Sequence, residues 1–183
     1  MVFGDPNKFS ILMEYLYYKD GLFYFIVNGQ MFPTFPFVSI LAENTLCLEQ
    51  NNPLTNPPEN KELFFMDKLD AYTQIMNKMN PEVLNRDFET PDDFEEDRSY
   101  NATTDNIGDD SSYVFAIGYQ EQIRILVAKR SFLSGNPDDG YEWIDYDNLE
   151  VAEVILPKIE VQKIIYGVRE YYDLVKQYSK SKV

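Results

Sequence analysis

Carboxylates are the only reactive side chains that this sequence holds in quantity, and several of them stand in close pairs. The pairs are Asp92-Asp93, Asp109-Asp110, Asp138-Asp139 and Asp145 with Asp147. A carboxylate-dependent hydrolase, for example one acting on a sugar, needs two carboxyl groups held about 5–10 Å apart across a rigid cleft. These pairs lie in stretches rich in turn residues, which are typical of loops. Loops of this kind give no sign of a rigid cleft. We therefore interpret them as a solvated acidic surface and keep the hydrolase as the less favoured alternative.

Residue types that other active sites and metal sites need are scarce. The chain has no histidine and a single cysteine, Cys47. Without histidine, the chain alone cannot form a Ser-His-Asp or Cys-His nucleophile system or a zinc site built on histidine. Residues 105–110 and 136–140 resemble calcium-binding loops superficially, but neither has the D-x-[DN]-x-[DN]-G spacing followed by a glutamate. The sequence thus predicts a protein that is not an enzyme and holds no metal or cofactor.

The negative charge of the chain is concentrated in two blocks. Acids outnumber bases by 31 to 16, which gives a formal net charge of −15. Residues 87–110, here called the acidic segment, carry −9, and residues 138–153 carry −7, so the rest of the chain is nearly neutral. Such a surface repels nucleic acid and anionic lipid and attracts basic partners. We therefore expect no direct binding to nucleic acid or membranes.

The N-terminal third has the pattern of a β-meander. Apolar residues alternate from Phe9 to Tyr17, and residues 22–27 are apolar on both faces, as in a covered strand. Asn28-Gly29 is a strong hairpin signal because both residues tolerate positive φ, and a short strand over 30–32 follows. Residues 37–50 fit either a helix or a strand.

The remaining elements alternate between helix and strand patterns. Asp67 is placed to cap a helix that ends at Asn80-Pro81, and a long amphipathic helix follows Pro157. Between them, residues 113–127 predict a hairpin in which Arg124 points outward. Residues 134–140 predict a turn-rich loop, and residues 141–146 a possible further strand.

Together these elements predict one α+β domain over residues 1–183. Its sheet is expected to be mainly antiparallel, built from the N-terminal meander and the central hairpin, with helices packed on one side. The acidic segment contains too few apolar residues to pack on its own, so we expect a mobile loop there. The first residues, Met1–Pro6, lack the pattern of a secretory signal, and we expect a cytoplasmic protein.

Two N-terminal stretches resemble a known family. Met1–Ile11, with the start Met-Val-Phe-Gly-Asp-Pro, and Gly21–Pro33, with the pattern G-x-F-x-F-x-h-N-G-x-x-h-P, resemble the immunity 42 family of bacterial polymorphic toxin systems. The resemblance is close over about 33 residues and rests beyond them on the order of elements and the length. It implies a cytoplasmic antitoxin that binds the C-terminal domain of a cognate toxin and blocks it by direct occlusion. The expected toxin domain is basic or a nuclease. The resemblance implies no catalytic residues.

Surface complementarity would then carry the function, and the acidic blocks are the expected contacts. The predicted partner-binding residues are Asp92, Asp93, Glu95, Glu96 and Asp97, followed by Asp138, Asp139, Glu142 and Asp145. One alternative stays open beside the hydrolase. An acidic protein of this kind could mimic nucleic acid and inhibit basic proteins in general, and it would then bind several of them rather than one.

Overall fold

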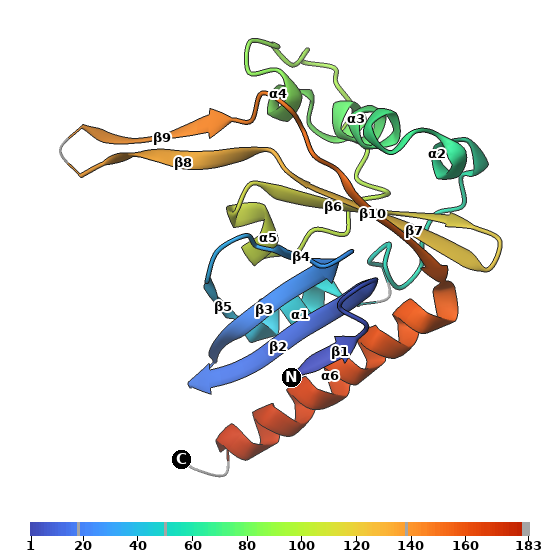
Figure 1. Cartoon of the computed structure of the whole chain (residues 1–183), viewed down its shortest axis with the longest axis vertical. Coiled ribbons are helices and arrows are strands. Elements are labelled where there is room, and N and C mark those ends of the chain that lie inside the picture. Colours follow the sequence, from blue (N-terminus) through green and yellow to red (C-terminus); the bar gives the residue numbers. More distant parts are fainter. Residues whose placement is uncertain (18, 50, 138, 181–183) are drawn as a thin grey trace.

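The computed structural model describes residues 1–17, 19–49, 51–137 and 139–180. It contains an N-terminal sheet, a central sheet and a separate hairpin, all with antiparallel pairing, together with helices (Figure 1). The strands are β1 (Val2–Gly4), β2 (Phe9–Tyr17), β3 (Asp20–Val27), β4 (Gln30–Phe32), β5 (Val38–Ile40), β6 (Ser112–Tyr119), β7 (Gln122–Lys129), β8 (Ser131–Asn136), β9 (Gly140–Asp145) and β10 (Ala152–Pro157). The helices are α1 (Leu41–Cys47), α2 (Lys61–Phe65), α3 (Lys68–Met79), α4 (Pro81–Leu84), α5 (Asp105–Asp109) and α6 (Lys158–Lys180). The predicted α+β class with a mainly antiparallel sheet is confirmed.

The N-terminal sheet has the strand order β1-β2-β3-β4, with β5 also paired to β3. Its β3-β4 turn is the predicted Asn28-Gly29 hairpin, and both residues have positive φ, +50° and +79°. The stretch 37–50, which the sequence left open, divides into the short strand β5 and helix α1. The meander that the sequence predicted is therefore present, with an additional edge strand on each side.

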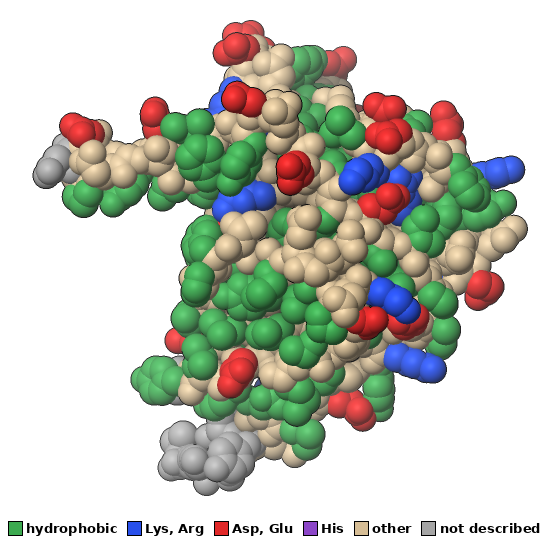
Figure 2. Space-filling view, in the orientation of Figure 1, with side chains coloured by type: hydrophobic (Ala, Val, Ile, Leu, Met, Phe, Trp, Pro, Cys, Tyr) green, Lys and Arg blue, Asp and Glu red, His purple; other side chains and the backbone are tan. Residues whose placement is uncertain are grey.

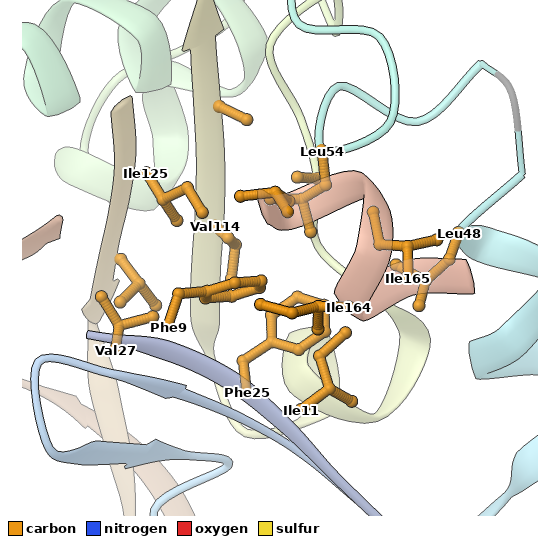
Figure 3. Close-up of a cluster of buried hydrophobic side chains, with 14 of the residues drawn as sticks. Phe9, Ile11, Phe25, Val27, Leu48, Leu54, Val114, Ile125, Ile164 and Ile165 are labelled. Atoms are coloured by element: carbon orange, nitrogen blue, oxygen red, sulfur yellow. The ribbon is translucent and has the colours of Figure 1, made fainter. Parts of the chain in front are cut away.

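The central sheet has the order β10-β7-β6 and is covered on both faces. Alternate side chains of β6 and β7 enter two different cores. Val114, Ile125 and their neighbours join a core with the N-terminal sheet, α1 and α6, part of which Figure 3 shows. Phe115 and Leu126, on the other face, pack against α2 and α3. The helices therefore lie on both sides of the central sheet, which is the middle layer, and the expectation that they pack on one side is wrong.

Arg124 lies on β7 and was expected to point outward, which is wrong. Its side chain is buried because α2 covers this face of the sheet. The guanidinium donates to the backbone oxygens of Leu63, Phe64 and Met66 at 2.7–3.1 Å, and Nε donates to Glu153 at 2.6 Å. These carbonyls belong to the end of α2, where a cation stabilises the unpaired acceptors. A buried charge is tolerated here because Nε has a carboxylate acceptor and Nη1 has three backbone acceptors.

The two longest helices, α3 and α6, are stabilised in different ways: α3 by a side-chain cap and α6 by close packing. Asp67 caps α3, as predicted, by accepting from the N–H groups of Leu69 at 2.8 Å and Asp70 at 3.4 Å. Helix α6 lies across β1 and β2, and a Cβ at Gly167 would stand 3.0 Å from the ring of Phe3, so the helix approaches β1 closely there. None of the helices in the described parts of the chain is both long and apolar enough to cross a membrane.

Only part of the acidic segment is exposed, so the predicted mobile loop is restricted to residues 87–99. Its C-terminal part contributes buried side chains, including Ala102 and Ile107, and Asn106 donates to the backbone oxygen of Phe23 at 2.6 Å. Residues 87–99 lie mostly on the surface. A few apolar and polar groups near the end of the segment are sufficient to attach it to the core, and mobility stays a prediction for residues 87–99.

Candidate functional site

The hairpin β8–β9, here called the arm (residues 131–145), projects from the body of the molecule (Figure 1). The sequence predicted a loop over 134–140 and indicated a strand over 141–146. In the structure, β8 continues to Asn136 and β9 covers Gly140–Asp145. Within the described chain, β8 and β9 pair only with each other. The arm therefore has no sheet behind it, and most of its described side chains beyond Ser131 and Phe132 are exposed.

A polar cluster at the base holds the arm in place. Asp145, at the end of β9, accepts from Arg86 Nε at 3.1 Å and Nη2 at 2.8 Å, and from Arg130 Nη2 at 3.1 Å. Arg130 also donates to the backbone oxygens of Val83 at 2.7 Å and Leu84 at 3.2 Å. Paired bonds of this kind fix direction as well as distance, so the cluster sets the angle between the arm and α4.

Beside the base lies a groove with a volume of about 510 Å³, here called the basal groove. Its charged and aromatic lining residues include Glu82, Arg86, Asp109, Arg130, Trp143 and Asp145. A second hollow of about 450 Å³ shares Asp109 and Tyr113 with it and extends toward Glu96 and Arg98 of the acidic segment. The two acidic blocks, separate in the sequence, are thus brought side by side at the base of the arm.

The predicted contact residues of the acidic segment differ in their surroundings. Asp92, Asp93 and Glu95 are exposed, and Glu96 pairs with Arg98 at 2.7 Å. Asp97 accepts hydrogen bonds from the side chain and the N–H of Ser99, which lower the pKa of its carboxyl below the ordinary value. Its own N–H donates to the backbone oxygen of Lys78 at 2.9 Å, so this end of the run is tied to α3.

The predicted contact residues of the arm differ as well. Glu142 is exposed, whereas Asp139 is engaged in the turn, where its carboxylate accepts from the side chain of Asn136 at 2.8 Å. Asp145 is neutralised by the two arginines and acts as an anchor of the arm. Asp138 lies outside the described residues. Figure 2 shows acidic side chains both along the arm and at the top of the body.

Sequence reasoning missed the residues that make this surface distinctive. Leu133, Tyr141 and Trp143 are apolar or aromatic and exposed on the arm, and Arg86 and Arg130 hold its base. A signal was present: Gly135 to Gly140 contains turn residues, and strand-like residues flank it on both sides. The pairing of Asp145 with Arg86, 59 positions away, has no local signal.

The two carboxylates of the Asp109-Asp110 pair have different surroundings. Asp109 is exposed, but its neighbour Asp110 is buried and paired with Lys129 at 2.6 Å. Asp110 also accepts from the N–H of Thr34 at 2.8 Å. Among the described residues, no three acidic or cysteine side chains come together in a way that could hold a metal ion.

The structure is that of an α+β protein with a projecting arm that carries exposed apolar and acidic side chains. Its fold is similar to that in the crystal structure of CdiI from Burkholderia dolosa AUO158, with a TM-score of 0.65 and 18% sequence identity over 93% of this chain and 99% of that chain. None of the curated proteins is similar enough to this chain to count as a match. At this identity, the likeness to the solved structure shows a shared fold.

The family follows from the sequence of almost the whole chain. The family model described as Immunity protein 42 matches residues 1–171, and the chain therefore belongs to that family. The resemblance noted in the N-terminal 33 residues is confirmed, and the match includes the acidic segment and the arm. The protein is an immunity protein, which neutralises a toxin.

Proposed function

We propose that this protein binds the C-terminal domain of a cognate toxin directly and blocks it by occlusion, in the cytoplasm and without catalysing a reaction. The observation that carries the proposal is the exposed arm with its basal groove, in a member of an immunity family. An inhibitor of this kind needs complementary surface and a few well-packed anchors rather than a nucleophile. The surface residues described above supply both apolar and charged groups for such contacts.

The distribution of charge supports a basic toxin domain, such as a nuclease, as the partner. The acidic segment and residues 138–153 carry more negative charge than the chain as a whole. Acids at the edge of an interface mainly raise the association rate with a cationic partner, and salt weakens this effect. The exposed acids Asp92, Asp93, Glu95 and Glu142 are proposed to act in this way, with Glu96, Asp97 and Asp139 as less free members of the same set.

Co-expression with the toxin domain encoded immediately upstream tests the proposal. We expect the chain to restore growth and to form a complex with that toxin domain. Loss of toxin activity should be stoichiometric, with activity titrated away at one equivalent of the immunity protein. Absence of rescue together with absence of a complex would contradict the proposal. Inactivation of a large excess of toxin by a small amount of this protein would support the hydrolase instead.

Selectivity separates direct occlusion of one toxin from general mimicry of nucleic acid. We expect the chain to bind its cognate toxin domain and to ignore unrelated basic proteins of similar charge, such as histones. The association rate should fall as the salt concentration rises from about 50 to about 500 mM, and the dissociation rate should change less. Comparable binding to several basic proteins would favour the mimic.

A further inference from the structure

We propose that the groove-facing side of the arm, formed by Leu133, Tyr141 and Trp143, inserts into an apolar cleft of the toxin domain that is flanked by lysine or arginine. This inference rests on the proposed function and names the surface that performs it. The partner is specified by its chemistry: an apolar recess for the aromatic side chains and cations that meet the acids around them.

The three side chains share one face of the arm. Leu133 pairs with Trp143 across the two strands, and Tyr141 stands two residues before Trp143, so their side chains point to the same side. They are 51%, 59% and 38% exposed in the order Leu133, Tyr141 and Trp143. Tyr141 lies opposite Gly135, which has no side chain to cover the ring. Tyrosine and tryptophan dominate the energetics of interfaces when a partner covers them.

This face continues into the basal groove. Trp143 and Asp145, which alternate on the same side of β9, both line the groove, together with Glu82 and Asp109 from α4 and α5. A segment packed against Tyr141 and Trp143 would therefore extend naturally toward these two carboxylates. Glu82 and Asp109 are both exposed, so both can contact a cation at the surface. Glu82 also accepts a hydrogen bond from the Thr90 hydroxyl at 2.6 Å.

The arm is held ready for such an insertion. Arg86 and Arg130 fix Asp145, and on the opposite face the rings of Phe132 and Tyr146 pack at a centroid distance of 5.1 Å. A two-stranded hairpin alone is marginally stable in water, so these contacts at the base matter for its orientation. An element that is already ordered loses less entropy when it binds.

The charge of the arm favours a basic toxin over a second copy of this chain. Residues 131–145 contain four acids and no base, so pairing two arms would bring like charges together. The same charges protect the open edges of β8 and β9, because acidic side chains discourage edge-to-edge pairing between copies. A cationic partner converts this repulsion into attraction. A basic partner with an apolar cleft therefore matches both properties of the surface.

Single substitutions on the arm, compared with a matched position elsewhere, test the proposal. Tyr141→Ala and Trp143→Ala should each raise the Kd for the purified toxin domain at least about thirtyfold, the scale of an interface hot spot. Tyr166→Ala is the control, because Tyr166 is an exposed tyrosine on α6, 64% exposed compared with 59% for Tyr141. We expect Tyr166→Ala to change the Kd less than about twofold. Circular dichroism melts verify that each variant is folded.

A spectroscopic measurement on the unmutated protein gives a second readout. Trp143 is the only tryptophan in the sequence, so incorporation of 5-fluorotryptophan gives a single 19F resonance from the arm. Binding of unlabelled toxin should shift this resonance and reduce its sensitivity to a soluble paramagnetic agent. A resonance unchanged in the saturated complex would overturn the proposal even if the arm variants failed to fold.

The outcomes separate this inference from the proposed function. If the unmutated chain neither binds nor neutralises the toxin, the proposed function fails. If it does both, and the arm variants are equal to the Tyr166→Ala control, the arm inference fails while the proposed function stands. If the unmutated chain is a dimer in gel filtration and Trp143→Ala converts it to a monomer, the arm is an interface between copies and the inference is overturned.

Discussion

The acidic segment and the arm are alike in composition and opposite in placement. Both belong to blocks with a large excess of carboxylates, yet the acidic segment ends inside the core while the arm stands away from it. Ile107 of the acidic segment is fully buried, whereas Tyr141 and Trp143 of the arm remain exposed. The core thus takes up Ile107 of the acidic segment, whereas Tyr141 and Trp143 of the arm stay available for contact with a partner.

The difference shows that anchors, rather than average charge, decide where an acidic stretch lies. Asp110 is buried because Lys129, the N–H of Thr34 and the hydroxyl of Ser112 all satisfy its carboxylate. Asp145 of the arm is anchored at the surface, with its side chain 25% exposed, by Arg86 and Arg130. Asp110 therefore attaches the acidic segment to the core, whereas Asp145 fixes the projecting arm at its base.

Removing the buried anchor should have the largest effect on stability. Asp110→Ala leaves the Thr34 N–H without its acceptor and removes the carboxylate from the Lys129 ammonium, which keeps the Thr34 hydroxyl as an acceptor at 2.6 Å. We expect the free energy of unfolding to fall by about 3 kcal/mol. The estimate takes the lower end of the usual range because the Lys129 side chain is 11% exposed and can reach some water. Urea unfolding monitored by circular dichroism measures the change.

The adjacent acid provides the control for this experiment. Asp109 is exposed, and Asp109→Ala should change the free energy of unfolding by less than about 0.5 kcal/mol. Equal effects of the two substitutions would show that the buried carboxylate of Asp110 does not anchor the acidic segment to the core.

The sequence predicted the elements whose signals are local. The Asn28-Gly29 turn, the Asp67 cap of α3, the hairpin of β6 and β7, and the helix after Pro157 all follow from neighbouring residues or from periodicity. These features depend on backbone preference and on apolar spacing within one element. The structure confirms each of them.

Features that depend on distant partners could not be predicted in this way. Arg124 appeared to be an outward position because Ile123 and Ile125 face the core on either side of it. Its burial depends on backbone oxygens of α2, about 60 positions away. The candidate surface also depends on distant partners. The sequence identifies the acids of the arm as charged contact residues. Only the fold shows that Asp145 anchors the base of the arm and that Trp143 and Asp145 both line the basal groove.

Removing the surface anchor should loosen the arm more than it destabilises the fold. Asp145→Ala leaves Arg86 and Arg130 close together without a shared carboxylate, and we expect a loss of about 1 kcal/mol in the free energy of unfolding. Amide hydrogen exchange over residues 131–145 should accelerate about fivefold, because local opening no longer breaks these bonds. Hydrogen exchange with mass spectrometry measures this directly.

Asp147→Ala is the matched control, since Asp147 is an exposed acid two residues beyond the anchor. It removes the same charge, and we expect exchange in the arm to stay within about twofold of the unmutated protein. If exchange also accelerated throughout the central sheet in Asp145→Ala, the cluster would be stabilising the whole domain rather than the arm.

The smallest expected effect concerns the exposed part of the acidic segment, where Asp97 is held by local hydrogen bonds. Bonds from Ser99, first from its side chain and then from its N–H, lower the pKa of Asp97 below the ordinary value of 3.8. The unfolded chain then binds more protons than the folded one as pH falls below the ordinary range. The contribution of Asp97 to stability is therefore present above that range and lost as pH falls through the folded pKa.

Ser99→Ala should raise the pKa of Asp97 toward 3.8 without restoring it fully, because the N–H bond of residue 99 at 2.9 Å remains. A carboxyl 13C NMR titration of Asp97 measures this, with Ser134→Ala on the arm as a serine substitution that should leave the titration in place. Identical titrations in both variants would mean that the Ser99 hydroxyl does not hold this part of the acidic segment. The exposed acids next to Asp97 would then lack the local anchor that Asp110 and Asp145 provide for the two better-fixed regions.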